Sequence, residues 1–236
     1  MTNPAADPSL RKIARVAGLL YLVLIIAGIL AEFFVRSSLI VTGDAAATAN
    51  NIMQSGGLYR IGIAADLIMI LCDVALALAF YLLLKPVSHP LALLAAFFRL
   101  AQAATLGTNL LNLFFVLKLV GGAGYLNVFS ADQLHSLALL FLEAHSIGYS
   151  IGLVFFGLCL FVLGYLVFKS GYLPGILGIL LILASLGYLI DSFALVLLPN
   201  YLDYETLFAL VVFVPAFIAE LALCIWLLIK GVKTAE

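Results

Sequence analysis

The sequence predicts an all-α, polytopic membrane protein built as a single bundle of six transmembrane helices. Of the 236 residues, 66% are hydrophobic and only 10% are charged, and the mean hydropathy is +1.26. A soluble domain carries roughly 25% charged residues. The apolar residues also form six runs that can each cross about 30 Å of hydrocarbon at about 1.5 Å per residue. We therefore expect the lipid bilayer to surround most of the chain.

The predicted transmembrane domain covers residues 15–230, between cytoplasmic segments at 1–14 and 231–236. The first apolar run is about 20 residues long, whereas the apolar part of a signal peptide has roughly 7–15, so we interpret it as a retained helix. We expect the six helices at about 15–35, 60–84, 91–118, 134–168, 173–198 and 206–229.

Prolines and capping residues mark the connections between these helices. Pro86 and Pro90 bracket the turn after the second helix. In the long connection at 37–59, Asp44 can cap a short helix. Ser130 and Gln133 form a capping-box pattern that opens the fourth helix. That helix then exceeds the bilayer thickness, so it must tilt, project from the membrane or break near its glycines.

Basic residues predict the orientation. Most of them fall in the connections on the same side as the two termini. The positive-inside rule then places both termini in the cytoplasm. The tyrosines near helix ends, Tyr59, Tyr172 and Tyr201 among them, are expected at the two membrane interfaces.

Ionisable residues inside the apolar runs mark the candidate sites. Each costs at least a few kcal/mol near a bilayer centre unless it is protonated, paired or facing water. At a level nearer the cytoplasm, Arg99 needs a carboxylate, which Asp73 or Glu220 can supply. Gln102 lies on the same helical stripe as Arg99. The sequence predicts an ion pair here that satisfies the buried charges between helices and forms a plug beneath the outer residues. The alternative is a functional gate or a clamp for the carboxylate of a substrate.

A second set of polar residues lies at an outer level. We expect an outward-opening, acidic cavity lined by Glu32, Asp66, Asn109, Asn112, Glu143, His145 and Asp191. These acids could be protonated and hydrogen-bonded within the bundle, could bind a cation or proton, or could bind a metal ion through His145, Glu143 and Asp191. Glu143 and His145 are about 200° apart on a helix, so chelation by both would need a local break.

Three functional hypotheses follow. We favour binding or transport of a cation or a proton-coupled small solute over catalysis. The first alternative is a membrane-embedded, metal-dependent hydrolase acting on a lipid or amphiphile, with Glu143 or Asp191 as base. The second is a structural or assembly subunit. A net charge of −1 without a basic cluster argues against a nucleic-acid partner, and the oligomeric state stays open.

Six short polar segments of the sequence form a further pattern: AGLLY at 17–21, EFFVRSS at 32–38, AFFRLAQ at 96–102, EAHSIGY at 143–149, GYLIDSF at 187–193 and PAFIAE at 215–220. Together these segments resemble a family of bacterial integral membrane proteins catalogued as domain of unknown function 4386. The resemblance extends over about residues 11–232. It implies a multi-pass inner-membrane protein and carries no activity, substrate or catalytic residue.

Overall fold

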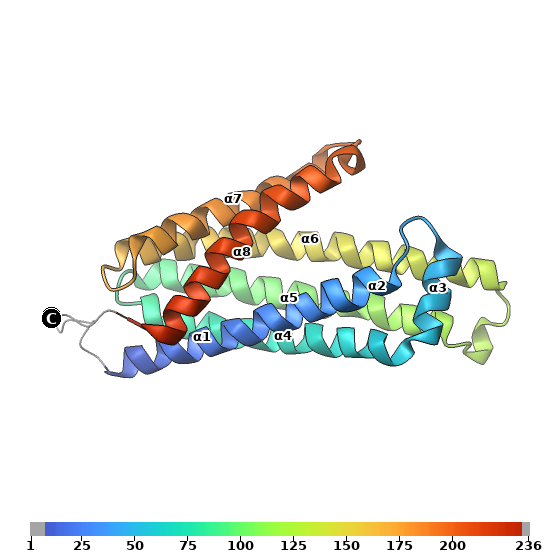
Figure 1. The fold of residues 1–236 in the computed structure, drawn as a ribbon, viewed down its shortest axis with the longest axis horizontal. Coiled ribbons are helices and arrows are strands. Elements are labelled where there is room, and N and C mark those ends of the chain that lie inside the picture. Colours follow the sequence, from blue (N-terminus) through green and yellow to red (C-terminus); the bar gives the residue numbers. More distant parts are fainter. Residues whose placement is uncertain (1–7, 233–236) are drawn as a thin grey trace. The chain divides into compact units, whose positions relative to one another are not determined.

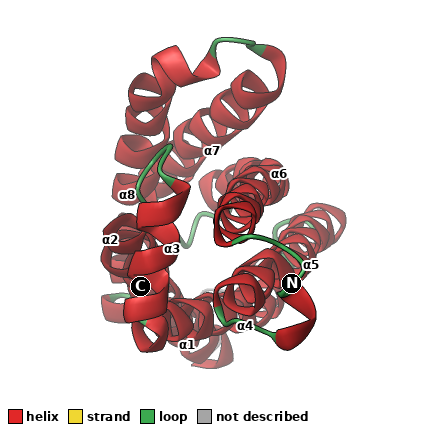
Figure 2. Cartoon of the chain, turned by 90° about the vertical axis from the view of Figure 1, so that its right-hand side faces the viewer, coloured by secondary structure: helices red, strands yellow, loops and turns green. Residues whose placement is uncertain are grey.

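The computed structural model describes residues 8–232, and all regular structure in that range is helical (Figures 1 and 2). Six helical spans in it are long and apolar enough to cross a membrane, which confirms the predicted fold class. The predicted terminal segments lie partly outside the described residues. The helices are α1 (Pro8–Ile29), α2 (Ser37–Leu39), α3 (Ala45–Gln54), α4 (Gly56–Leu84), α5 (His89–Val120), α6 (Ala131–Lys169), α7 (Gly175–Leu197) and α8 (Glu205–Ile229).

Two compact units make up the chain. Unit 1 contains residues 1–22, 72–103 and 151–236, and unit 2 contains residues 23–71 and 104–150. Four of the helices (α1, α4, α5 and α6) contribute residues to both units. Each unit has its own set of buried polar residues, and each set is described separately below.

In unit 1, α7 and α8 pack against each other as a hairpin (Figure 1). Small residues permit this close packing. A Cβ atom at Gly187 of α7 would lie 2.7 Å from the carbonyl oxygen of Val211 on α8. A Cβ at Gly164 of α6 would lie 2.7 Å from the carbonyl oxygen of Gly178 on α7. Both helix pairs therefore approach backbone to backbone.

In unit 2, the first transmembrane span changes its winding before it ends. Residues Leu30–Arg36 form a π-helical segment between α1 and α2. This conformation is rare in proteins, and where it occurs it is often found at a functional site. Asp44 caps α3 by accepting a hydrogen bond from the backbone N–H of Ala47 at 2.8 Å. The predicted capping of this short helix by Asp44 is thus confirmed.

Helix α6 opens with the predicted capping box. The backbone N–H of Ser130 donates to the side chain of Gln133 at 2.8 Å, and the N–H of Gln133 donates to the Ser130 hydroxyl at 3.3 Å. The helix then continues for 39 residues without interruption. The option of a break near its glycines is therefore wrong, and tilting or projection from the bilayer remains. Helix α4 begins at Gly56, four residues before the predicted start.

Candidate functional site

The first buried polar network lies in unit 1 and is centred on Arg99 of α5. The Nη2 atom of Arg99 lies 2.7 Å from Oδ1 of Asp73 on α4, and both side chains are only 1% exposed. Gln102, one turn further along α5, donates from Nε2 to the other Asp73 oxygen at 3.2 Å. Asp73, and not Glu220, is therefore the carboxylate beside Arg99, and Gln102 on the Arg99 stripe contacts the same side chain.

Aromatic rings complete the surroundings of Arg99. Its guanidinium carbon lies 5.5 Å from the ring centre of Tyr21, 5.7 Å from that of Phe80 and 5.3 Å from that of Phe156. The contact with Asp73 is close but poorly aligned, so none of the guanidinium nitrogens has a well-aligned hydrogen-bond acceptor among residues 8–232. The ring faces supply cation–π attraction in a site without water contact. They explain how the membrane span holds an arginine with a single carboxylate.

Glu220 of α8 is held differently. Its two carboxyl oxygens accept hydrogen bonds from the hydroxyls of Tyr21 at 3.0 Å and Tyr188 at 2.8 Å. None of the ion pairs found in the described part of the chain includes Glu220. Tyr21 thus touches both halves of the network, because its ring faces Arg99 and its hydroxyl donates to Glu220. We name Asp73, Arg99, Gln102, Glu220, Tyr21 and Tyr188 the Arg99 network.

A second network lies in unit 2 and is centred on Arg36, at the end of the π-helical segment. Its Nη1 atom donates to Oδ2 of Asp66 at 2.6 Å, and its Nε atom donates to Glu32 at 2.7 Å. Arg36 and Asp66 are buried, whereas the Glu32 side chain is 54% exposed. We name these three residues the Arg36 network. Arg36 thus compensates the charge of two of the acids that were predicted to line the outer cavity.

Asn109, Asn112 and His145 form a third group, also in unit 2. The Asn109 amide donates to the backbone carbonyl of His145 at 2.8 Å and lies 3.1 Å from His145 Nδ1. Asn112 donates to the Asn109 carbonyl oxygen at 2.9 Å. A Cβ atom at Gly148 would overlap the Asn109 side chain, so this glycine makes the contact of α5 with α6 possible. The Nε2 atom of His145 is buried and has no hydrogen-bond partner among the described residues.

The remaining two predicted residues lie apart from these groups. Glu143 is exposed while His145 is buried, so the uninterrupted α6 directs them to different sides. Asp191 belongs to unit 1, where it accepts a hydrogen bond from the hydroxyl of Tyr201 at 2.7 Å. Within residues 8–232, no three His, Cys, Asp or Glu side chains are arranged to hold a metal ion.

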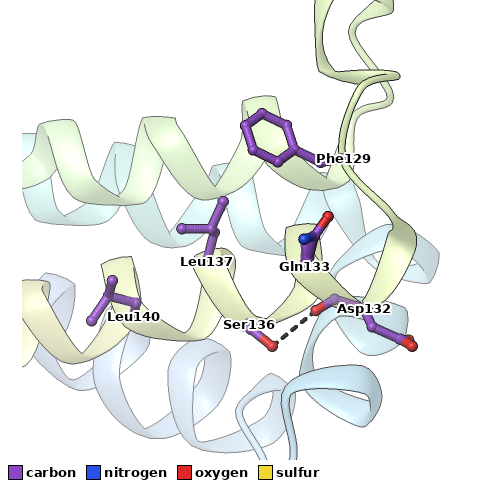
Figure 3. Close-up of a pocket in the computed structure, with 6 residues that line it drawn as sticks. All are labelled: Phe129, Asp132, Gln133, Ser136, Leu137 and Leu140. Carbon is purple, nitrogen blue, oxygen red and sulfur yellow. Dashed lines mark hydrogen bonds between the residues drawn. The ribbon is translucent and has the colours of Figure 1, made fainter.

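An open hollow of about 490 Å³ lies at the start of α6, and Figure 3 shows the residues that line it. It is lined by Phe129, Asp132, Gln133, Ser136, Leu137 and Leu140. Two of its polar side chains form hydrogen bonds within α6 and its N-terminal cap. Gln133 belongs to the capping box, and the Ser136 hydroxyl donates to the backbone carbonyl of Asp132 at 2.8 Å. None of the predicted site residues lines this hollow.

Sequence reasoning missed Arg36 and the tyrosines as partners of the acids. The spacing of Glu32 and Arg36, four residues apart on one helix, was a usable signal for the first pair. Tyr21, Tyr188 and Tyr201 had no comparable signal, because each pairs with an acid through the tertiary packing of unit 1. Tyr59 and Tyr172 are both buried, and their hydroxyls donate to the backbone carbonyls of Leu113 and Leu83 on other helices.

Comparison with known proteins identifies the family. The model described as "Domain of unknown function (DUF4386)" matches residues 16–231. The chain belongs to this family. A relative from Archaeoglobus fulgidus, described as an uncharacterized protein, is 34% identical over 169 residues, which cover 72% of this chain and 83% of the relative. No solved structure matches the chain. Neither description states an activity.

Proposed function

We propose that this multi-pass membrane protein binds a proton at Glu220 and couples it to a small solute or a cation. The observation that carries the proposal is the pair of tyrosine hydroxyls on a buried carboxyl group. A hydroxyl both donates and accepts, so Tyr21 and Tyr188 can donate to a carboxylate, and one of them can turn to accept from a carboxylic acid. Asp73 and Asp66 instead face arginines, whose charge is fixed.

Proton binding at Glu220 would change the electrostatic forces on the other residues of the Arg99 network. Glu220 and Arg99 share Tyr21, and Arg99 holds Asp73. When Glu220 is ionised, the three charged side chains sum to −1; when it is protonated, they sum to zero. In a buried site the effective dielectric constant is low, so electrostatic forces are strong. The guanidinium group of Arg99 is therefore expected to take one position when Glu220 is ionised and another when Glu220 is protonated. The network thus has the parts of a proton-dependent gate.

The outer polar residues retain a part in this proposal. His145 offers an unpartnered ring nitrogen beside Asn109, and these groups could bind the polar part of a solute. As part of this proposal the chain lies in a bacterial inner membrane, and the distribution of basic residues supports a cytoplasmic location of both termini.

Infrared difference spectroscopy of the protein in liposomes tests proton binding at Glu220. Between about pH 5 and pH 9, the wild type should show the carbonyl band of a protonated carboxyl group that titrates. Glu220→Gln should remove this band. The matched control Glu143→Gln should keep it, because Glu143 is an exposed glutamate on α6. A titrating band that persists in Glu220→Gln would refute the assignment, as would its absence from the wild type.

Repeating the titration with sodium or potassium ions separates two forms of the proposal. If a cation competes with the proton, raising its concentration at fixed pH should decrease the carboxyl band in the wild type. If the proton alone occupies Glu220, the band should not respond to either ion, and the coupled species is a solute. Tyr188→Phe should shift the titration in both cases, since it removes one of the two hydroxyl partners.

A further inference from the structure

A shallow groove runs between α4 and α5 within unit 2. It encloses about 200 Å³ and is lined by Arg60, Ile63, Ala64, Leu67, Phe114 and Leu117. Ile63 is buried and forms its floor, whereas Leu67 and Phe114 are 45% and 43% exposed. Every lining residue except Arg60 is apolar. In a membrane span, such an apolar surface faces lipid chains.

Two cations lie at one end of this groove. Arg60 is the fifth residue of α4, and Lys118 lies in the last turn of α5, next to Leu117. Both side chains are exposed. None of the ion pairs in the part of the chain that the structure describes involves either residue. The one acid on the neighbouring turns of α4, Asp66, is buried and paired with Arg36.

The two cations at one end of the groove suit the charged headgroup of an anionic lipid, and the apolar lining suits its acyl chains. Helix ends lie at the level of the lipid headgroups, where arginine and lysine bind phosphate. From Arg60 to Leu67 the groove descends seven residues, about 10 Å along the helix. A Cβ atom at Gly107, seven residues before Phe114 on α5, would meet no atom within 4 Å, so the surface stays open in that direction. We propose that the groove binds one anionic glycerophospholipid of the surrounding bilayer, its phosphate on Arg60 and Lys118 and an acyl chain along the apolar residues.

Quenching of a local tryptophan by brominated lipids tests this site. The reporter is Leu71→Trp, one turn beyond Leu67 on α4, in a chain whose native tryptophan is removed by Trp226→Phe. Liposomes contain either brominated phosphatidylglycerol or brominated phosphatidylcholine. A cation near the membrane surface contributes about fivefold to the binding of an anionic lipid, so we expect at least a fivefold preference for phosphatidylglycerol. Leu183→Trp on α7, which is 51% exposed, is the control reporter and should show no preference.

Variants that remove the two cations test whether these cations cause the lipid preference. Arg60→Gln with Lys118→Gln should bring the preference at residue 71 to about one, whereas Lys169→Gln, which removes an exposed cation at the end of α6, should leave it unchanged. Phe114→Trp provides a second reporter inside the groove if the first variant folds poorly. Equal quenching by both lipids in the parent chain, or a preference that survives the double substitution, would overturn the proposal.

Discussion

The Arg99 and Arg36 networks solve the same problem, a guanidinium group in a membrane span, with different partners. Arg99 has one carboxylate and three aromatic ring faces, and its surroundings are sealed from solvent. Arg36 has two carboxylates, no ring contact among those found in the described residues, and one partner, Glu32, that is 54% exposed. The comparison shows that aromatic faces can take the place of a second acid around a fully buried guanidinium group, and that two carboxylates, one of them half-exposed, serve where no ring faces it.

Removing the sealed arginine should have the largest effect. Arg99→Met leaves Asp73 buried without its cation, which typically destabilises a protein by about 3–5 kcal/mol. We expect a corresponding loss of thermal stability in mild detergent, measured by tryptophan fluorescence. Adding Asp73→Asn to Arg99→Met should restore part of the stability, because no unpaired charge then remains. A single variant as stable as the wild type would show that Asp73 is protonated and does not need Arg99.

Replacing Asp66 in the Arg36 network should destabilise the protein more than replacing Glu32. Asp66→Asn removes a buried partner and is expected to cost about 2–3 kcal/mol, less than a complete loss of pairing because Glu32 still contacts Arg36. Glu32→Gln changes a half-exposed partner, and its cost should stay below about 1 kcal/mol. Chemical denaturation of both variants in the same detergent measures the order. Equal costs would mean that Glu32 is as sealed as Asp66, and the contrast with the Arg99 network would disappear.

The smallest expected loss of stability comes from removing a hydrogen bond between uncharged groups, and it gives a reference for the losses predicted for the two arginine networks. Tyr172, in the connection between α6 and α7, donates from its hydroxyl to the backbone carbonyl of Leu83 at 2.6 Å. Tyr172→Phe should cost about 1 kcal/mol at neutral pH. Burial raises the pKa of Tyr172 to about 12. Because folding raises this pKa, the stabilisation is complete below about pH 10 and is lost as the pH rises through about 12.

The stability difference between wild type and Tyr172→Phe should therefore shrink over that alkaline range. Other tyrosines titrate in both proteins and cancel from the difference. A difference that stays constant up to about pH 12 would contradict the assignment of this hydroxyl as a buried donor.

Much of the fold could be predicted because hydropathy and helix caps are local signals. Six apolar runs and the pattern of Ser130 and Gln133 suffice for the spans and for the start of α6. The pairing of Asp73 with Arg99 and Gln102 was also accessible, because helical periodicity places Arg99 and Gln102 on one stripe. The candidate site was harder, since its partners come from distant helices. Nothing near Glu220 in the chain indicates that Tyr21, 199 positions earlier, donates to it.

Arg36 was missed as a partner of the acids for a different reason. A basic residue at the end of an apolar run normally extends to the headgroup region, and the sequence offers no sign that the helix changes its winding there. The π-helical segment at Leu30–Arg36 alters the direction in which its residues project. Periodicity counted at about 100° per residue therefore fails across this segment.

The π-helical segment also makes the first span sensitive to its length in residues. The backbone N–H of Ser37 donates to the carbonyl of Glu32, five residues earlier, instead of four as in an α-helix. A π-helical turn holds about one residue more than an α-helical turn, so deleting one residue from 30–35 would let the span close as a regular α-helix with Arg36 facing nearly the same side. Deleting a second residue would turn Arg36 by about 100° around the axis. Asp66 would then lose its cation although every ionisable residue is still present. Insertions and deletions in this one turn, more than substitutions, are thus the changes by which related chains would gain or lose the Arg36 network.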